Sequence, residues 1–149
     1  MSVDFSQRWA WAEVDLGAVR HNVAHVASIV APAQVWAVVK ANAYGHGSVQ
    51  VAQAALEAGA TGLCVAVVDE GVVLRRAGIV APVLVMSEQP ADTAPFLVGY
   101  GLTPTVTTTM GAAAIASAAQ ATGREVPVHL KVDTGMHRVG AQDRKSTRL

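Results

Sequence analysis

The sequence has little of several residue types that mark common classes of protein. Its single cysteine, Cys64, excludes an internal disulfide framework and cannot form a cysteine-rich zinc site. Charged residues make up only 15% of the chain, and eleven basic residues balance eleven acidic ones. There is therefore no basic surface of the kind that binds phosphate backbones or anionic lipid, which argues against nucleic acid and membrane surfaces as partners.

Long apolar runs are missing as well. No stretch approaches the ~20 apolar residues of a membrane span, and the start, MSVDFSQRWAWAEVD, lacks the charged and apolar regions of a secretory signal. We therefore expect a cytoplasmic protein. Hydrophobic residues nevertheless make up 52% of the chain, enough for a packed core. Cys64 lies in the apolar run LCVAVV without a basic neighbour, which predicts a buried structural thiol rather than a nucleophile.

Short β-branched runs alternate with longer helical patterns along the chain. The expected strands are VWAVV before Lys40, LCVAVV from Leu63, PVLVM from Pro82, LTPTV from Leu102 and VPVHLKVD from Val126. The expected helices run from Leu16 to Val30 with Asp15 as N-cap, from Ser48 as N-cap to Gly59, from Asp69 to Gly78, and from Thr108 or Thr109 to Gly123. This order is typical of βαβ units and predicts an α/β fold with a parallel sheet.

Five strands are compatible with two architectures. They could form an open doubly wound sheet, or the first part of a (β/α)8 barrel, which needs ~250 residues. Under the barrel interpretation the chain is truncated a little past halfway. After VDTGMHRVGAQ the sequence becomes a polar tail where the next helix should begin. We therefore expect residues 1–141 to belong to the domain and residues 142–149 to be non-native, from a cloning, assembly or reading-frame artefact.

Lys40 follows an apolar strand, where a lysine is unexpected on grounds of burial. In parallel α/β folds the active site lies at the carboxyl ends of the strands, and a lysine shielded from water there can form a Schiff base. Taken alone, Lys40 is more simply explained as a strand-end lysine that extends to solvent. The histidines and carboxylates have no spacing that indicates a metal site, so we expect none.

The residues around Lys40 favour the first interpretation. The segment KANAYGHG resembles the cofactor motif of alanine racemases, enzymes that depend on pyridoxal 5'-phosphate (PLP). The resemblance implies that Lys40 forms the internal aldimine with PLP and is one of two catalytic bases. It also implies that Tyr44 helps to hold the cofactor phosphate. Asn42 and His46 match the motif with less defined roles.

A second group of polar residues lies in HLKVDTGMHRVG, about ninety residues later. Strand alternation places Lys131 and Asp133 on one face, which would point into a barrel interior. The segment resembles the racemase stretch whose arginine, here Arg138, contacts the cofactor's phenolic oxygen and steers the substrate carboxylate. The resemblance implies that Lys131 is carbamylated, as in many family members. A plain ion pair between Lys131 and Asp133 is the alternative.

The resemblance covers the chain to about Ala141, including the opening AWAEVDLGAVRHNV. It implies the first five strands of a PLP-binding (β/α)8 barrel of the TIM type, from an isomerase that interconverts L- and D-alanine, supplies D-alanine for peptidoglycan and acts as a homodimer. The opposing catalytic tyrosine, most of the phosphate site and a C-terminal β domain would lie outside this chain, so we expect the fragment to be inactive alone. The alternatives are a racemase of another small amino acid such as serine, or a PLP-carrier protein without turnover.

Overall fold

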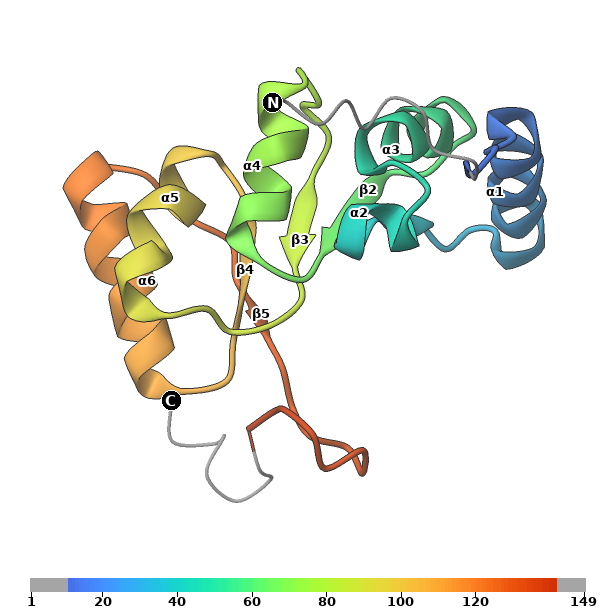
Figure 1. Ribbon diagram of the computed structural model, residues 1–149. Coiled ribbons are helices and arrows are strands. Elements are labelled where there is room, and N and C mark those ends of the chain that lie inside the picture. The colour runs from blue at the N-terminus through green and yellow to red at the C-terminus, as the bar shows by residue number, and fades with distance from the viewer. Residues whose placement is uncertain (1–10, 142–149) are drawn as a thin grey trace, which may run out of the picture.

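A computed structural model describes residues 11–141 and contains one parallel sheet of five strands in the order β1-β2-β3-β4-β5 (Figure 1). The strands are β1 (Trp36–Val38), β2 (Gly62–Val65), β3 (Val83–Val85), β4 (Thr103–Val106) and β5 (His129–Leu130). Each strand pairs with its neighbour in sequence. This order fits the wall of a barrel, because a doubly wound sheet reverses its strand order partway across.

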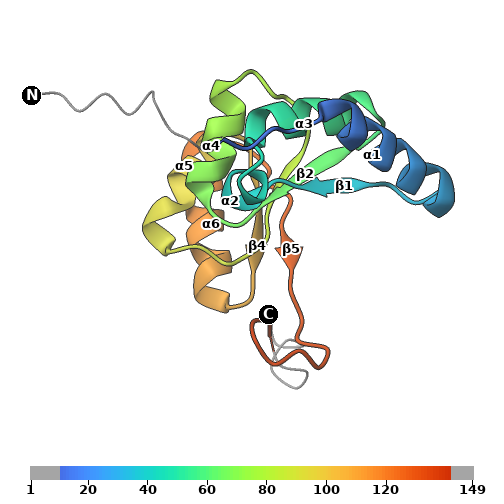
Figure 2. The same ribbon diagram turned by 45° about the vertical axis from the view of Figure 1, so that its right-hand side comes forward.

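Most helices lie on one face of the curved sheet, as the two views show, whereas the first helix, Leu16–Val30, packs against the helix Ser48–Glu57 (Figures 1 and 2). The helical elements are α1 (Leu16–Val30), α2 (Lys40–Tyr44), α3 (Ser48–Glu57), α4 (Val68–Arg76), the 3-10 helix η1 (Ala91–Thr93), α5 (Ala94–Gly99) and α6 (Thr109–Thr122). No helix among the described residues has the length and apolar character that crossing a membrane requires.

Alternation along the strands separates a helix-covered face from an open face. Leu63, Val65, Val83 and Val85 are fully buried and belong to the core shared with the helices. The opposite face is more open, and Val38, which is in register with Cys64, is 40% exposed. The concave side of the sheet is therefore the side on which a ligand has room.

Cys64 is buried at 7% exposure, and burial raises the pKa of its thiol. A buried thiol with a raised pKa is a poor nucleophile. The expectation of a structural cysteine is thus confirmed.

Two of the three expected N-caps are confirmed. The Asp15 carboxylate accepts hydrogen bonds from the first turn of α1, and the Thr108 hydroxyl accepts one from Gly111 in α6. The third was wrong, because the N-cap of α3 is Gly47 and Ser48 is already helical. The Ser48 amide instead receives its cap from the side chain of Asn42, at 2.9 Å from Oδ1.

The last strand is shorter than VPVHLKVD predicted. β5 covers only His129–Leu130. The chain then forms a loop whose two ends pair through an isolated β-bridge between Val132 and Ala141. The sequence analysis also placed no helix between the third and fourth strands, where η1 and α5 lie. Six residues of α5, with proline in its first turn, are too few to display a helical period.

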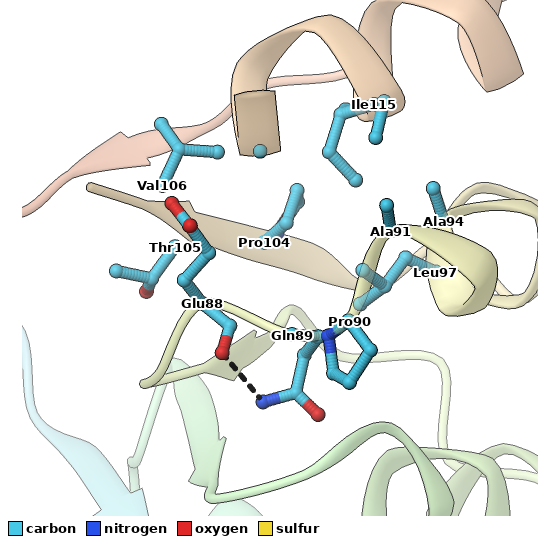
Figure 3. A pocket seen from close by; sticks show the side chains of 12 residues that line it. Glu88, Gln89, Pro90, Ala91, Ala94, Leu97, Pro104, Thr105, Val106 and Ile115 are labelled. Atoms are coloured by element: carbon cyan, nitrogen blue, oxygen red, sulfur yellow. Dashed lines mark hydrogen bonds between the residues drawn. The ribbon is translucent and has the colours of Figure 1, made fainter. Parts of the chain in front are cut away.

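Side chains join the carboxyl ends of neighbouring strands. The Ser87 hydroxyl, just after β3, donates to the Ala66 carbonyl just after β2 at 2.7 Å, and the Gln89 amide donates to the same carbonyl. Glu88 reaches the other way, across β4 toward the start of α6 (Figure 3). These contacts fix the relative positions of three strand ends.

The Glu88 carboxylate accepts hydrogen bonds from the backbone amides and the hydroxyls of both Thr107 and Thr108. Its position requires a glycine at 111, where a Cβ would come within 2.6 Å of the carboxylate. Partial burial acts to raise the pKa of Glu88, but the four hydrogen bonds outweigh it and hold the pKa below its ordinary value of 4.5.

We expect Glu88→Gln to lower the stability of the full-length protein by about 1–2 kcal/mol at neutral pH, since a charged acceptor is lost. Because the folded pKa is depressed, this contribution is fully present above pH 4.5 and disappears as the pH falls through the lower folded value. Thermal unfolding of both proteins between about pH 7 and about pH 3 measures the gap. A gap that stays constant over this range would show that the charge of Glu88 contributes nothing.

Candidate functional site

An open groove of about 390 Å³ lies at the carboxyl ends of the strands. It brings together four of the side chains that the sequence singled out, Lys40, Tyr44, Lys131 and Arg138, although they come from segments about ninety residues apart. The other residues of the lining are Val38, Ala66, Met86, Ser87 and Val139. The sequence analysis missed Met86 and Ser87, although their position directly after β3 is where barrel folds place functional residues.

The segment after Lys40 adopts a left-handed turn. The four residues Ala41–Tyr44 all have φ between 50° and 55°, and none of them is glycine. For L-amino acids this conformation costs about 1–2 kcal/mol per residue. Such strain persists only where surrounding contacts impose it, and it is concentrated at functional sites.

The turn places Tyr44 next to Lys40. The Lys40 Nζ lies 5.9 Å from the centroid of the Tyr44 ring, within the range of a cation–π contact. Tyr44 remains 61% exposed, so its ring and hydroxyl are open to a ligand in the groove. A compact turn thus presents an amine and a phenol to the same space.

Asn42 and His46 stabilise the turn from within. The Asn42 carbonyl accepts a hydrogen bond from Gly47 at 2.9 Å, while its side chain caps α3 through Ser48. The His46 ring nitrogen Nδ1 lies 2.7 Å from the Ala43 carbonyl. Neither residue lines the groove, so both have a structural place in the motif.

Arg138 is carried by a loop that closes on itself. The Ala141 amide donates to the Lys131 carbonyl at 2.8 Å, and the Asp133 amide donates to the Ala141 carbonyl at 3.0 Å. Gly140 permits this closure, because it has φ of 145° and a Cβ there would lie 2.5 Å from the Asp133 amide nitrogen. The loop returns to the end of β5 and presents Arg138 to the groove.

The expectation that Asp133 points into the interior together with Lys131 was wrong. β5 ends before both residues, and the Asp133 carboxylate turns into its own loop. It accepts hydrogen bonds from the amides of His137 and Gly135, both at 3.0 Å, and pairs with the His137 ring at 3.2 Å. The hydrogen bond from the His137 backbone amide, and after it the one from the Gly135 amide, lowers the pKa of Asp133. The alternative of an ion pair between Lys131 and Asp133 is therefore not realised.

The charge of the groove is uniformly positive. Lys40, Lys131 and Arg138 line it, and no acidic side chain does. The ion pairs within residues 11–141 join other groups, Arg20 to Glu57 and His137 to Asp133. Clustered cations without a carboxylate are what an anionic ligand with phosphate or carboxylate groups needs.

The small cavity beside Glu88, of about 10 Å³, has room for no more than about one water.

Comparison with known proteins gives a consistent result across the chain. The family profile "Alanine racemase, N-terminal domain" matches residues 14–149. An alanine racemase from Desulfosudis oleivorans is 49% identical over 138 residues, which cover 92% of this chain and 35% of the relative. An alanine racemase from Symbiobacterium thermophilum is 47% identical over 142 residues, and this chain covers 38% of that relative.

Solved structures agree with the sequence matches. Alanine racemase from Clostridium difficile 630 in complex with cycloserine superposes with a TM-score of 0.90 at 32% identity, over 95% of this chain and 40% of that one. The enzyme from Bacillus anthracis with bound L-Ala-P gives 0.85 at 40% identity, over 93% of this chain and 36% of that one. The five strands thus match the first part of a TIM-type barrel, and this confirms the predicted fold. The chain belongs to the alanine racemase family and spans a little over a third of the length of the relatives it matches.

Proposed function

We propose that the parent protein interconverts L- and D-alanine with PLP attached to Lys40, and so supplies D-alanine for peptidoglycan. The observation that carries the proposal is the convergence of Lys40, Tyr44, Lys131 and Arg138 on one cationic groove at the carboxyl ends of the strands. The groove fits PLP, because the cofactor has an anionic phosphate and a phenolic oxygen and needs an accessible amine. The names of the relatives support the reaction.

Each residue has a distinct task in this proposal. When bound, PLP supplies an electron sink for the negative charge left by loss of the substrate's α-proton. Lys40 Nζ would accept or return that proton on one face, since the amine lines the groove. Tyr44, next to it, would donate a hydrogen bond from its hydroxyl to the phosphate. Arg138 would hold the phenolic oxygen and the substrate carboxylate through its guanidinium group.

Lys131 is the residue that we propose to be carbamylated. Its side chain lines the groove with two other cations and is not paired with Asp133. Once its ammonium group has lost a proton, the amine would add carbon dioxide and release a second proton. The resulting carbamate is an anion, which would relieve the repulsion and orient the Arg138 guanidinium. A high-resolution structure of the full-length protein tests this directly, because an unmodified Nζ would refute it.

The groove needs further residues for a two-base reaction. Racemisation requires a second proton donor on the other face, and we propose a tyrosine from the C-terminal domain of the partner subunit in a homodimer. We also propose that the protein acts in the cytoplasm on a free amino acid, without nucleic acid or membrane partners. Residues 142–149 lie outside the described residues. Their non-native origin stays a prediction, which sequencing the gene beyond Ala141 tests.

We expect the 149-residue chain alone to lack racemase activity and to self-associate. β1 and β5 leave unpaired edges that a closed barrel does not have, and the concave face exposes Val38 at 40%. Size-exclusion chromatography with a coupled D-alanine assay measures both properties. A monodisperse monomer with the turnover of a complete enzyme would contradict the expectation.

Substrate and turnover distinguish the remaining alternatives. A racemase for serine would share this groove, and a PLP-carrier protein would share Lys40 without catalysing racemisation. We expect the full-length protein to exchange the α-proton of alanine and to release both enantiomers, with serine a poorer substrate. Proton exchange in deuterated water across a panel of amino acids measures this. Preference for serine, or cofactor binding without exchange, would favour the corresponding alternative.

A further inference from the structure

We propose that Glu70 is a positioning residue, which sets the orientation of Lys40 and Tyr44 by binding the backbone at the ends of β1 and β2. Its effect on the cofactor rests on the proposed function, whereas its effect on the backbone does not. Glu70 does not line the groove, and it lies in the first turn of α4.

The two oxygens of Glu70 bind two different strand ends. Oε1 accepts a hydrogen bond at 2.6 Å from the amide of Ala41, the residue directly after Lys40. Oε2 accepts one at 2.7 Å from Ala66, just after β2, and a longer one at 3.4 Å from Val67. A single carboxylate therefore joins the lysine-bearing segment to the neighbouring strand.

This contact comes at the point where the backbone is strained. Ala41 begins the run of four left-handed residues, and the remaining side-chain hydrogen bonds of the turn, from Asn42 and His46, are internal or reach only to Ser48. Among the described residues, Glu70 is the side chain from another element that hydrogen bonds this backbone. Loss of its acceptor would free the Ala41 amide and relax the turn.

A simpler role for Glu70 is to cap α4. Val67 at the N-cap has no side chain that could accept a hydrogen bond, and an acidic residue in the first turn stabilises a helix. A cap alone would change stability but leave the Lys40 segment untouched. The two roles therefore differ in what happens 29 residues away from the substitution.

Glu88 provides a matched control. It too is a carboxylate after a strand end that binds backbone amides of the next loop, but its partners are Thr107 and Thr108, on the side of the sheet away from Lys40. Glutamine at either position keeps the size of the side chain and replaces one acceptor oxygen by an NH2 group that cannot accept. Both substitutions remove hydrogen bonds, but only Glu70 binds the left-handed turn.

The test compares Glu70→Gln, Glu88→Gln and the unchanged full-length protein. Before PLP is added, hydrogen–deuterium exchange of a peptide covering residues 40–47 should be about tenfold faster in Glu70→Gln alone, as expected for loss of a hydrogen bond to a charged acceptor. After PLP is added, the apparent Kd of the lysine-bound cofactor should rise by about tenfold in the same variant alone.

Glu70→Asp covers the case in which Glu70→Gln fails to fold. Aspartate keeps the charge at the start of α4, but is one methylene too short to reach Ala41 and Ala66 together. We expect it to keep the melting temperature and still to speed exchange of residues 40–47. Unchanged exchange in the folded Glu70 variants would overturn the proposal and leave Glu70 as a cap. Faster exchange with unchanged PLP affinity would overturn the positioning of Lys40.

Failure of the proposed function has a separate signature. If PLP were attached to a different lysine, peptide mapping of the reduced adduct would show it. The change in hydrogen exchange in Glu70→Gln does not depend on that result.

Discussion

Replacing Lys40 by alanine in the full-length protein should abolish the visible absorbance of lysine-bound PLP and reduce racemisation of alanine by about 10³-fold or more. The reason is that one amine performs two tasks, attachment of the cofactor and proton transfer, and the second alone contributes about 10²–10⁴-fold. Absorbance spectra, borohydride reduction and a coupled D-alanine assay measure the two losses.

Lys131→Ala is the matched control, because this lysine lines the same groove. It should keep the absorbance of lysine-bound PLP and its sensitivity to borohydride, even where turnover falls. Proteolysis after reduction locates the modified peptide. A reduced adduct that persists in Lys40→Ala would show that another lysine carries the cofactor.

Arg138→Ala should lower kcat/KM for alanine by about 10²-fold, with little change in the melting temperature. The side chain is exposed and makes no hydrogen bond to any residue within 11–141, so its removal should cost less than about 0.5 kcal/mol of stability. Steady-state kinetics and thermal unfolding of the same preparation separate the two effects.

Two further variants sharpen the result for Arg138. Arg138→Lys keeps the charge but loses the planar pair of donors, and we expect activity between that of Arg138→Ala and the unchanged protein. Arg124→Ala, at an exposed arginine whose side chain hydrogen bonds to the Val98 carbonyl, should leave turnover unchanged. Parallel losses of activity and of folded protein in Arg138→Ala would support a purely structural role.

The strands and most helices followed from the sequence because their signals are local. Alternation of buried β-branched runs with helical periods predicted five parallel strands and the helices between most of them. The exception was the segment 91–99, where short helical elements carry no readable period. Periodicity alone left a barrel and a doubly wound sheet open, and the resemblance of the motifs to a known family decided for the barrel.

The site was predicted in part. Lys40, Tyr44, Lys131 and Arg138 were named from their motifs, and the structure brings them into one groove. Asp133 was misplaced because the prediction extended strand alternation beyond the point where β5 ends. A carboxylate followed by glycine and a turn binds its own loop instead.

The left-handed turn and its contact with Glu70 could not be predicted. Nothing in the alanines at 41 and 43 signals positive φ, which is ordinarily a property of glycine or asparagine. The contact joins residues 29 positions apart, and sequence periodicity carries no information about such a pair. Both depend on how α4 packs against the sheet.

The same contact implies an order of events during synthesis. Lys40 leaves the ribosome well before Glu70, and at that stage no partner compensates the strain of Ala41–Tyr44. The hydrogen bonds between later strand ends join residues 19 to 23 positions apart, so each strand end is fixed only after the following crossover has been synthesised. A nascent chain that ends shortly after Lys40 therefore carries the motif without its geometry. The arrangement that receives the cofactor is a late product of folding, gained only once α4 has packed beside β2.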